Sequence, residues 1–381
     1  MKLNRKDFLS LSGKSILGFS FLNSLSGTGN AKPVKGSSKT GDVMIEVKIK
    51  KLRLAHTWTI SRNSSDFKNN VFVKIQKDGI TGYGEAAPNV RYGENADLTT
   101  QKIKAAEPIF KKHSLFHFID LKQALDDNIL NQSCAKAAVD IAIMDWVGKA
   151  IEIPLYKMFG LNTEKAPVTS FSIGIDTLEV IKQKVREAEP YPILKIKVGK
   201  KNDREIINAV RSVTDKTIRV DANEGWKDKH EALEKIKWLV SEGVEFVEQP
   251  MPSDMLEETA WLRERVDVPI IADEAVKKAS DIPKLATAYD GINIKLMKSG
   301  GMLEALRMIQ MAKAMNMKIM LGCMIESSVA ISAAAHLAPY VDYADLDGNL
   351  LIDNDPFQGV KVDRGHFVYD EKPGLGVSGT F

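Results

Sequence analysis

The sequence predicts an α/β protein in which a (β/α)8 barrel of the TIM type follows a smaller N-terminal α+β domain. From Pro167 onward, short β-branched runs alternate with helical stretches. Eight such runs end 22 to 28 residues apart, near Ser170, Lys195, Asp221, Glu248, Asp273, Lys295, Cys323 and Asp345. Each interval suits one strand, one loop and one crossover helix. An open doubly wound sheet would need a glycine-rich phosphate turn, and the sequence has none.

The sequence pattern of the segment before the barrel predicts a separate α+β unit. Its first part alternates like a strand, and a turn at Asp78-Gly79 joins two further apolar runs as in a hairpin. Apolar residues then recur at helical intervals. We expect strands over residues 43–54, 71–75 and 81–85, and helices over residues 98–110 and 133–149.

Length, charge and cysteine content limit the class of protein. A chain of 381 residues is long enough for a barrel and a smaller domain, and 44% hydrophobic residues is typical of a globular protein. A net charge of +3, without any block of Lys or Arg, argues against nucleic acid as a partner. The two cysteines, Cys134 and Cys323, are interpreted as separate thiols.

The first residues have the layout of an export signal. Lys2, Arg5 and Lys6 form a basic start, and a short apolar stretch and small residues follow. The string Asn-Arg-Lys-Asp-Phe-Leu resembles a twin-arginine signal in which the second Arg is Lys. We therefore expect a signal peptide over residues 1–31, a linker over residues 32–42 and a periplasmic protein. If the N-terminus is no signal, the protein is cytoplasmic. The apolar stretch is too short for a spanning helix, so no membrane role beyond export is expected.

Three carboxylates close three consecutive strands of the predicted barrel: Asp221, Glu248 and Asp273. Neighbouring strands lie about 5 Å apart, so these side chains should converge on one small volume. They would repel one another unless a cation were bound between them. Oxygen ligands in this number favour Mg²⁺.

Lysines end two strands that stand across the barrel from each other. Lys195 and Lys197 share one face of the second strand, and Lys295 ends the sixth. Two opposed amines suit a 1,1-proton transfer, in which Lys197 or Lys295 removes a proton α to a carboxylate and the other delivers one to the opposite face. The metal would stabilise the resulting enediolate. The base would need a lowered pKa, which we expect from the cation and Lys195.

Several strings together resemble the muconate-lactonising subgroup of the enolase superfamily. They are Lys-Ile-Lys at 195–197, Asp-Ala-Asn-Glu-Gly-Trp at 221–226, Glu-Gln-Pro at 248–250, Ala-Asp-Glu at 272–274, Ile-Asn-Ile-Lys-Leu-Met-Lys-Ser-Gly-Gly at 292–301, Gly-Tyr-Gly-Glu at 82–85 and Lys-Pro-Gly-Leu-Gly at 372–376. The resemblance implies a capping domain over residues 43–160, a modified barrel over residues 161–350 and a C-terminal segment, 351–381, that returns to the cap. Relatives are often oligomers, which implies a possible homo-oligomer.

The same resemblance implies a dipeptide substrate. Asp345-Leu-Asp347 is similar to the pair with which dipeptide epimerases hold the α-ammonium group of their substrate. Cys323 and Ile325 would contact the peptide mainly through backbone groups, and Ser170 and Lys195 would also bind substrate. Arg62, on the loop that covers the site in this family, resembles the Arg that recognises a glutamate side chain. An L-Ala-D/L-Glu or related dipeptide, inverted at its C-terminal residue, is therefore the expected substrate.

Other functions remain open from the sequence. An N-acylamino acid racemase, an o-succinylbenzoate synthase or a muconate cycloisomerase would share the metal ligands and both lysines. Their substrates carry no ammonium group, so Asp345 and Asp347 favour the dipeptide epimerase. A non-catalytic peptide-binding protein of the envelope would have no need of two opposed bases. His336, on an Ala-rich helical run, is interpreted as a packed histidine and Lys298 as an ordinary charged residue.

Overall fold

The computed structural model describes residues 42–61 and 63–380. The predicted export signal, residues 1–31, and nearly all of the predicted linker lie outside this part of the chain. Those two predictions therefore stay predictions.

An antiparallel sheet of three strands opens the described chain. It runs in the order β1 (Met44–Thr59), β2 (Ser64–Lys77) and β3 (Ile80–Ala86). The tight turn between β2 and β3 has positive φ at both Asp78 and Gly79, which a two-residue hairpin of this hand requires. The sequence therefore located this hairpin correctly, although β1 and β2 are longer than predicted.

The long helix α5 (Ser133–Ala150) packs closely on this sheet. Two glycines of β3 make the approach possible: a Cβ at Gly84 would lie 1.9 Å from the carbonyl oxygen of Ala138, and one at Gly82 would lie 2.1 Å from that of Ala142. The other described α-helices of this part are α2 (Ala96–Ala105), α3 (Glu107–Phe110), α4 (Phe118–Asn128) and α6 (Leu155–Met158). Helix α4 was not predicted from the sequence.

Eight parallel strands form the barrel, as the sequence predicts. They are hydrogen-bonded in chain order: β4 (Phe171–Ile173), β5 (Ile193–Lys197), β6 (Thr217–Asp221), β7 (Val244–Glu248), β8 (Ile270–Ala272), β9 (Gly291–Lys295), β10 (Lys318–Gly322) and β11 (Tyr343–Asp345). A bridge between Thr169 and Ala344 joins the first strand to the last. The first strand was expected to end near Ser170, but Ser170 precedes it and lies at this closure, where its N–H bonds to the Ala344 carbonyl.

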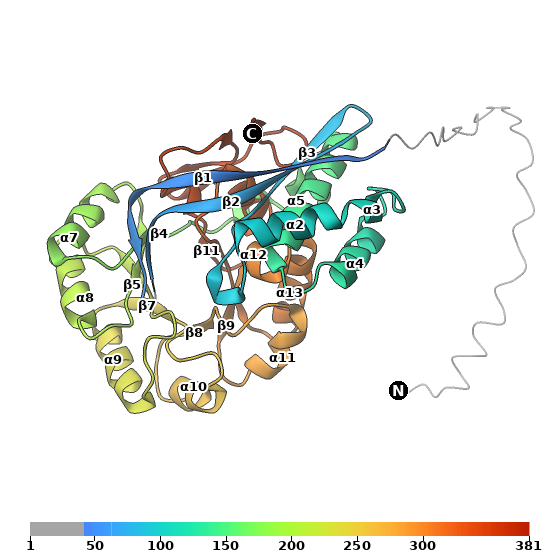
Figure 1. The fold of residues 1–381 in the computed structure, drawn as a ribbon. Coiled ribbons are helices and arrows are strands. Elements are labelled where there is room, and N and C mark those ends of the chain that lie inside the picture. Colours follow the sequence, from blue (N-terminus) through green and yellow to red (C-terminus); the bar gives the residue numbers. More distant parts are fainter. Residues whose placement is uncertain (1–41, 62, 381) are drawn as a thin grey trace, which may run out of the picture. The chain divides into compact units, whose positions relative to one another are not determined.

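Helices cover the outside of the barrel (Figure 1). They are α7 (Leu178–Glu187), α8 (Asp203–Arg211), α9 (Lys229–Ser241), α10 (Leu256–Arg263), α11 (Ile282–Leu285), α12 (Leu296–Ser299), α13 (Met302–Ala314) and α14 (Ser328–Ala335). They lie in the connections between successive strands, and in the described chain no α-helix follows β11. Helix α8 shows why they pack there: Ile206, Ile207 and Val210 lie on one face and are buried.

The chain after β11 runs back to the N-terminal domain. It contains four short strands, β12 (Phe357–Gln358), β13 (Lys361–Asp363), β14 (His366–Val368) and β15 (Ser378–Gly379). Near its end, the Leu375 N–H donates to the carboxylate of Asp145 in α5, and the Gly374 N–H bonds to the Ile153 carbonyl. This segment therefore ties the barrel to the first domain.

A buried glutamate of β3 joins the N-terminal sheet to the barrel. Glu85 accepts hydrogen bonds from the N–H and hydroxyl of Ser327 and from the N–H of Ala330, all at the start of α14. Asn70 of β2 also donates to Glu85 and to the Ile325 carbonyl. These contacts fix the sheet across the open, carboxyl-terminal end of the strands.

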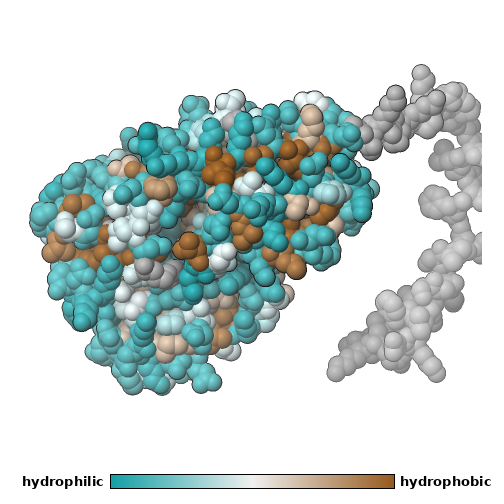
Figure 2. All heavy atoms as spheres, in the orientation of Figure 1, coloured by the Kyte–Doolittle hydropathy of each residue, from teal (hydrophilic) through white to brown (hydrophobic). Residues whose placement is uncertain are grey.

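The surface on the face shown in Figure 2 is mostly hydrophilic, with hydrophobic side chains in small separate groups. Among the described residues, no helix is long and apolar enough to span a membrane.

Candidate functional site

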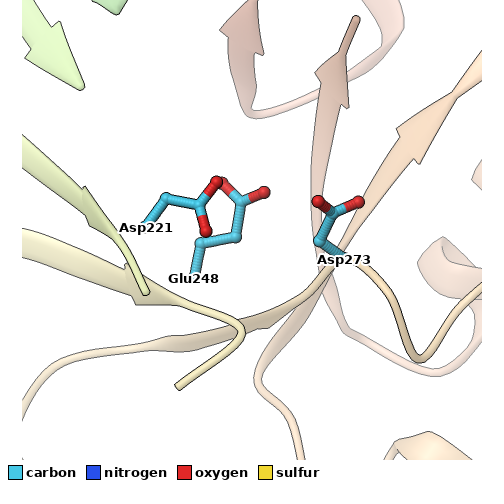
Figure 3. Close-up of side chains that lie close together, drawn as sticks. All are labelled: Asp221, Glu248 and Asp273. Atoms are coloured by element: carbon cyan, nitrogen blue, oxygen red, sulfur yellow. The ribbon is translucent and has the colours of Figure 1, made fainter. Parts of the chain in front are cut away.

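Three carboxylates meet at the carboxyl ends of neighbouring strands. Asp221 ends β6, Glu248 ends β7 and Asp273 follows β8, and all three are buried. One oxygen from each lies within 4.8 Å of the others. Figure 3 shows the carboxylates turned toward one another in the barrel interior. The strands therefore bring together the three residues predicted from the sequence.

Burial and mutual repulsion act on these groups. Burial raises the pKa of Glu248 to about 7, and the charges of Asp221 and Asp273 add to the rise. Burial would also raise the pKa of Asp221, but the amines of Lys197 and Lys195 outweigh it and lower that pKa to about 2. Three buried oxygen donors in one small volume fit a hard divalent cation, which would relieve the repulsion.

Lys195 connects the carboxylate cluster to the last strand of the barrel. Its buried Nζ lies 2.7 Å from Glu248 Oε2, 3.3 Å from Asp221 Oδ2 and 2.7 Å from Asp345 Oδ2. Burial lowers the pKa of Lys195, but the carboxylates outweigh burial and hold it well above the ordinary value. Lys195 is therefore a fixed cation within the cluster.

The other two predicted lysines face each other. Lys197 Nζ lies 2.5 Å from Asp221 Oδ2, and Lys295 Nζ lies 2.8 Å from Asp273 Oδ2. Their strands, β5 and β9, are four apart in a closed barrel of eight and so lie on opposite sides. The two amines thus flank the space above the carboxylates, as the sequence predicts for a pair of bases.

The pKa of Lys295 was expected to be lowered by a bound cation and by Lys195, and the charge of Lys195 does act in that direction. Burial lowers the pKa as well, but Asp273 outweighs burial and holds it above the ordinary value. A cation held by Asp273 would oppose that effect. The expected lowering is therefore not a property of the protein groups alone.

Lys298 corrects another expectation, because it is not an ordinary surface charge. Helix α12 turns it back into the barrel, where its buried amine donates to the Asp273 carboxylate and to the Asp273 and Asn293 carbonyls. The sequence does not indicate that Lys298 is buried beside Asp273, because this position depends on the single turn of α12 that follows Lys295.

Asp345 and Asp347 lie together at the end of β11 but in different surroundings. Asp345 accepts hydrogen bonds from Lys195 and from the hydroxyls of Ser170 and Ser172. Asp347 Oδ2 accepts the N–H of Ser172 at 2.6 Å, and its Oδ1 lies 3.8 Å from Cys323 Sγ. Burial and the charge of Asp345 raise the pKa of Asp347 to about 7. Asp347 is thus the less neutralised of the two.

A cavity of about 590 Å³ lies above these groups, between the strand ends and the N-terminal sheet. Seven of the predicted site residues line it: Lys197, Asp273, Lys295, Cys323, Ile325, Asp345 and Asp347. Ser170 is fully buried and does not line it, because its hydroxyl lies against Asp345. Lys195 does not line it either. Both support the site from below.

The structure gives the contacts of Cys323, Ile325 and His336, but it does not describe Arg62. The Cys323 thiol donates to the Asp345 carbonyl, and the Ile325 carbonyl is held by Asn70. Arg62 lies outside the described residues, so its predicted role stays a prediction. His336 is buried and accepts the Tyr156 N–H, as expected of a packed histidine.

Ser172 and Trp58 are among the residues of the site that were not predicted from the sequence. Ser172 bonds to Asp345, the last residue of β11, and to Asp347, which follows the strand. Strand alternation from Ser170 could have identified it. Trp58, at the end of β1, lies with its ring 5.9 Å from Lys197 Nζ and also lines the cavity. No motif in the sequence indicates that contact.

Two sequence families match the chain. The N-terminal domain of the mandelate racemase / muconate lactonizing enzyme family matches residues 44–160, and the enolase C-terminal domain-like family matches residues 178–379.

Individual relatives match nearly the whole described chain. An L-Ala-D/L-Glu epimerase of Bacteroides thetaiotaomicron is 42% identical over 98% of this chain and 99% of its own length. An L-Ala-D/L-amino acid epimerase of Pedosphaera parvula is 41% identical over 84% of this chain and 94% of its own. A dipeptide epimerase of Cytophaga hutchinsonii, solved with Mg and D-Ala-L-Val, has a TM-score of 0.84 at 29% identity and covers 88% of this chain and 95% of that one. The chain belongs to the mandelate racemase / muconate lactonizing enzyme family of the enolase superfamily.

Proposed function

We propose that the protein is a Mg²⁺-dependent dipeptide epimerase that inverts the α-carbon of the C-terminal residue of its substrate. One observation carries the proposal: two lysine amines face each other across a cavity, between a carboxylate cluster on one side and an acidic pair on the other. The names of the relatives support it, because they are epimerases of L-Ala dipeptides, and one was solved with Mg and a dipeptide.

Asp221, Glu248 and Asp273 would hold the ion. Bound there, Mg²⁺ supplies positive charge for the substrate carboxylate and for the negative charge that develops beside it. Asp347, supported by Asp345, would receive the α-ammonium group in a charge-assisted bond. These two contacts would fix the substrate along the line from β7 to β11 and place its C-terminal α-carbon between the lysines.

The lysines would carry the proton transfer. The neutral amine of one lysine takes the α-proton as the C–H bond breaks, and the electron pair moves into the carboxylate. The ammonium of the other lysine then gives a proton to the opposite face of the carbon. Electrons and atoms balance without an oxidant, since one proton leaves and one arrives. Because β5 and β9 lie on opposite sides, the product has the inverted configuration.

A proton-exchange experiment separates this function from its alternatives. The purified protein with Mg²⁺ is incubated in D₂O with L-Ala-L-Glu and other dipeptides, and in parallel with N-succinylamino acids. We expect a gain of one mass unit, and inversion, on dipeptides. Exchange on N-succinylamino acids alone would replace the epimerase by an N-acylamino acid racemase. Binding of dipeptides without exchange would favour a peptide-binding protein.

We also propose that the enzyme is exported and acts on cell-wall peptides. The support is the basic and apolar pattern of residues 1–31, together with a site suited to peptides. Cell fractionation followed by N-terminal sequencing of the mature protein tests this proposal. An intact N-terminus in the cytoplasmic fraction would contradict it. Gel filtration would test the predicted homo-oligomer.

A further inference from the structure

The fixed groups of the site leave one direction for the side chain of the reacting residue. This step rests on the proposed function. The carboxylate cluster is centred on the end of β7 and the acidic pair lies at the end of β11, while the two lysines end β5 and β9. Three substituents of the reacting α-carbon are thus directed toward the barrel. They are the carboxylate, the hydrogen, and the peptide nitrogen that leads to the N-terminal residue and its ammonium group. The fourth, the side chain, must point out of the barrel toward the N-terminal sheet.

Strand β2 covers that direction. Asn70 reaches into the site, since its amide holds the Ile325 carbonyl at 2.9 Å. Lys68 is two residues earlier on the same strand, so it shares the face of Asn70 and lies about 7 Å along the strand. Lys68 lines the cavity and is half-buried. Its amine can therefore reach a side chain that leaves the barrel.

Lys68 differs from the other described cations that line the cavity. Lys197 pairs with Asp221, Lys295 with Asp273, and Arg91 with Glu224 at 2.6 Å. Within the described part of the chain, Lys68 has neither an ion pair nor a side-chain hydrogen bond. A cation held in a cavity wall without a partner is suited to an anionic group of a ligand.

We propose that Lys68 binds the carboxylate of an acidic side chain on the C-terminal residue of the dipeptide. Lys68 is thereby a specificity-determining residue for glutamate-like substrates.

The pKa of Lys68 is consistent with this role. Burial lowers it below the ordinary value, which means that the charged amine lacks compensating contacts. A bound carboxylate would oppose that effect and favour the charged amine. Membership of the family does not decide the point. One relative is named for L-Ala-D/L-Glu and another, at nearly the same identity, for L-Ala-D/L-amino acids.

The test compares a charged substrate with its neutral isostere. Values of kcat/KM for α-proton exchange are measured with L-Ala-L-Glu and L-Ala-L-Gln for the wild type, Lys68→Met, Lys68→Arg and Lys74→Met. Lys74 is a matched control on the same strand, since it pairs with Glu46 and does not line the cavity. We expect the Glu/Gln ratio to fall about tenfold or more in Lys68→Met. It should stay high in Lys68→Arg and be unchanged in Lys74→Met.

Several results would overturn the inference. An unchanged ratio in Lys68→Met would do so, and so would a wild type that does not prefer Glu to Gln. A ratio that falls in Arg62→Met but not in Lys68→Met would assign the recognition to Arg62 instead. Retained exchange of L-Ala-L-Gln by Lys68→Met shows that the variant is folded. If the wild type exchanges no dipeptide at all, the proposed function fails and this inference fails with it.

Discussion

Replacing Asp347 by Asn tests the proposed ammonium site most closely. Asn is nearly isosteric and can still accept the Ser172 N–H with its side-chain oxygen, so the fold should be kept. What it removes is one negative charge. Asp345 cannot take over fully, because Lys195 and two serine hydroxyls already bond to it.

The size of the effect follows from the charges. Two unit charges about 4 Å apart interact by about 4 kcal/mol at an effective dielectric constant of about 20, which corresponds to about a thousandfold. Since Asp345 retains part of the attraction, we expect kcat/KM for a dipeptide to fall about a hundredfold in Asp347→Asn.

The assay is α-proton exchange at pH 8, where Asp347 is charged in the wild type. The comparison substrate is the same dipeptide acetylated at its N-terminus, which has no ammonium group. Its small rate should not fall in Asp347→Asn. A loss below about fivefold for the free dipeptide, or an equal loss for the acetylated one, would refute the assignment of Asp347.

Three further predictions concern pH, ligand support and packing. Because burial and Asp345 raise the pKa of Asp347 to about 7, its charge is lost as pH falls through that value. The kcat/KM of the wild type should therefore decline below about pH 7. A decline of the same size in Asp347→Asn would show that the titration of Asp347 is not its cause. Lys298→Met should weaken Mg²⁺ binding about 10- to 100-fold in calorimetric titrations, because Asp273 loses the amine that orients its carboxylate. An unaltered Mg²⁺ affinity would show that Lys298 does not support Asp273 as a metal ligand. Gly84→Ala should lower the free energy of unfolding by about 3 kcal/mol or more, because the added Cβ meets the Ala138 carbonyl of α5; a denaturant midpoint equal to that of the wild type would contradict the close packing.

The barrel and its metal ligands could be predicted because short, local sequence patterns indicate both. Each strand is a short apolar run, and the residue at its end lies at the open face by topology alone. Asp221, Glu248 and Lys295 are therefore found by counting along the chain. The dipeptide hypothesis came from the resemblance carried by Asp345 and Asp347.

The rest depends on contacts between distant segments. Lys298 could not be distinguished from a surface lysine, because a single turn of helix after β9 brings it to Asp273. Ser170 was placed in the substrate site, whereas barrel closure puts it behind Asp345. Lys68 carries no motif, and its position over the cavity follows only from the way Asn70 and Glu85 join the N-terminal sheet to the barrel.

The most direct measurement follows the two epimers of one dipeptide separately in D₂O with Lys197→Ala and Lys295→Ala. Two opposed bases predict that neither variant inverts the substrate, with losses of at least about a thousandfold. Each variant should still exchange the α-proton of one epimer, and the two variants should act on opposite epimers. If both exchange the same epimer, or if either inverts the substrate at the wild-type rate, the two-lysine account is wrong.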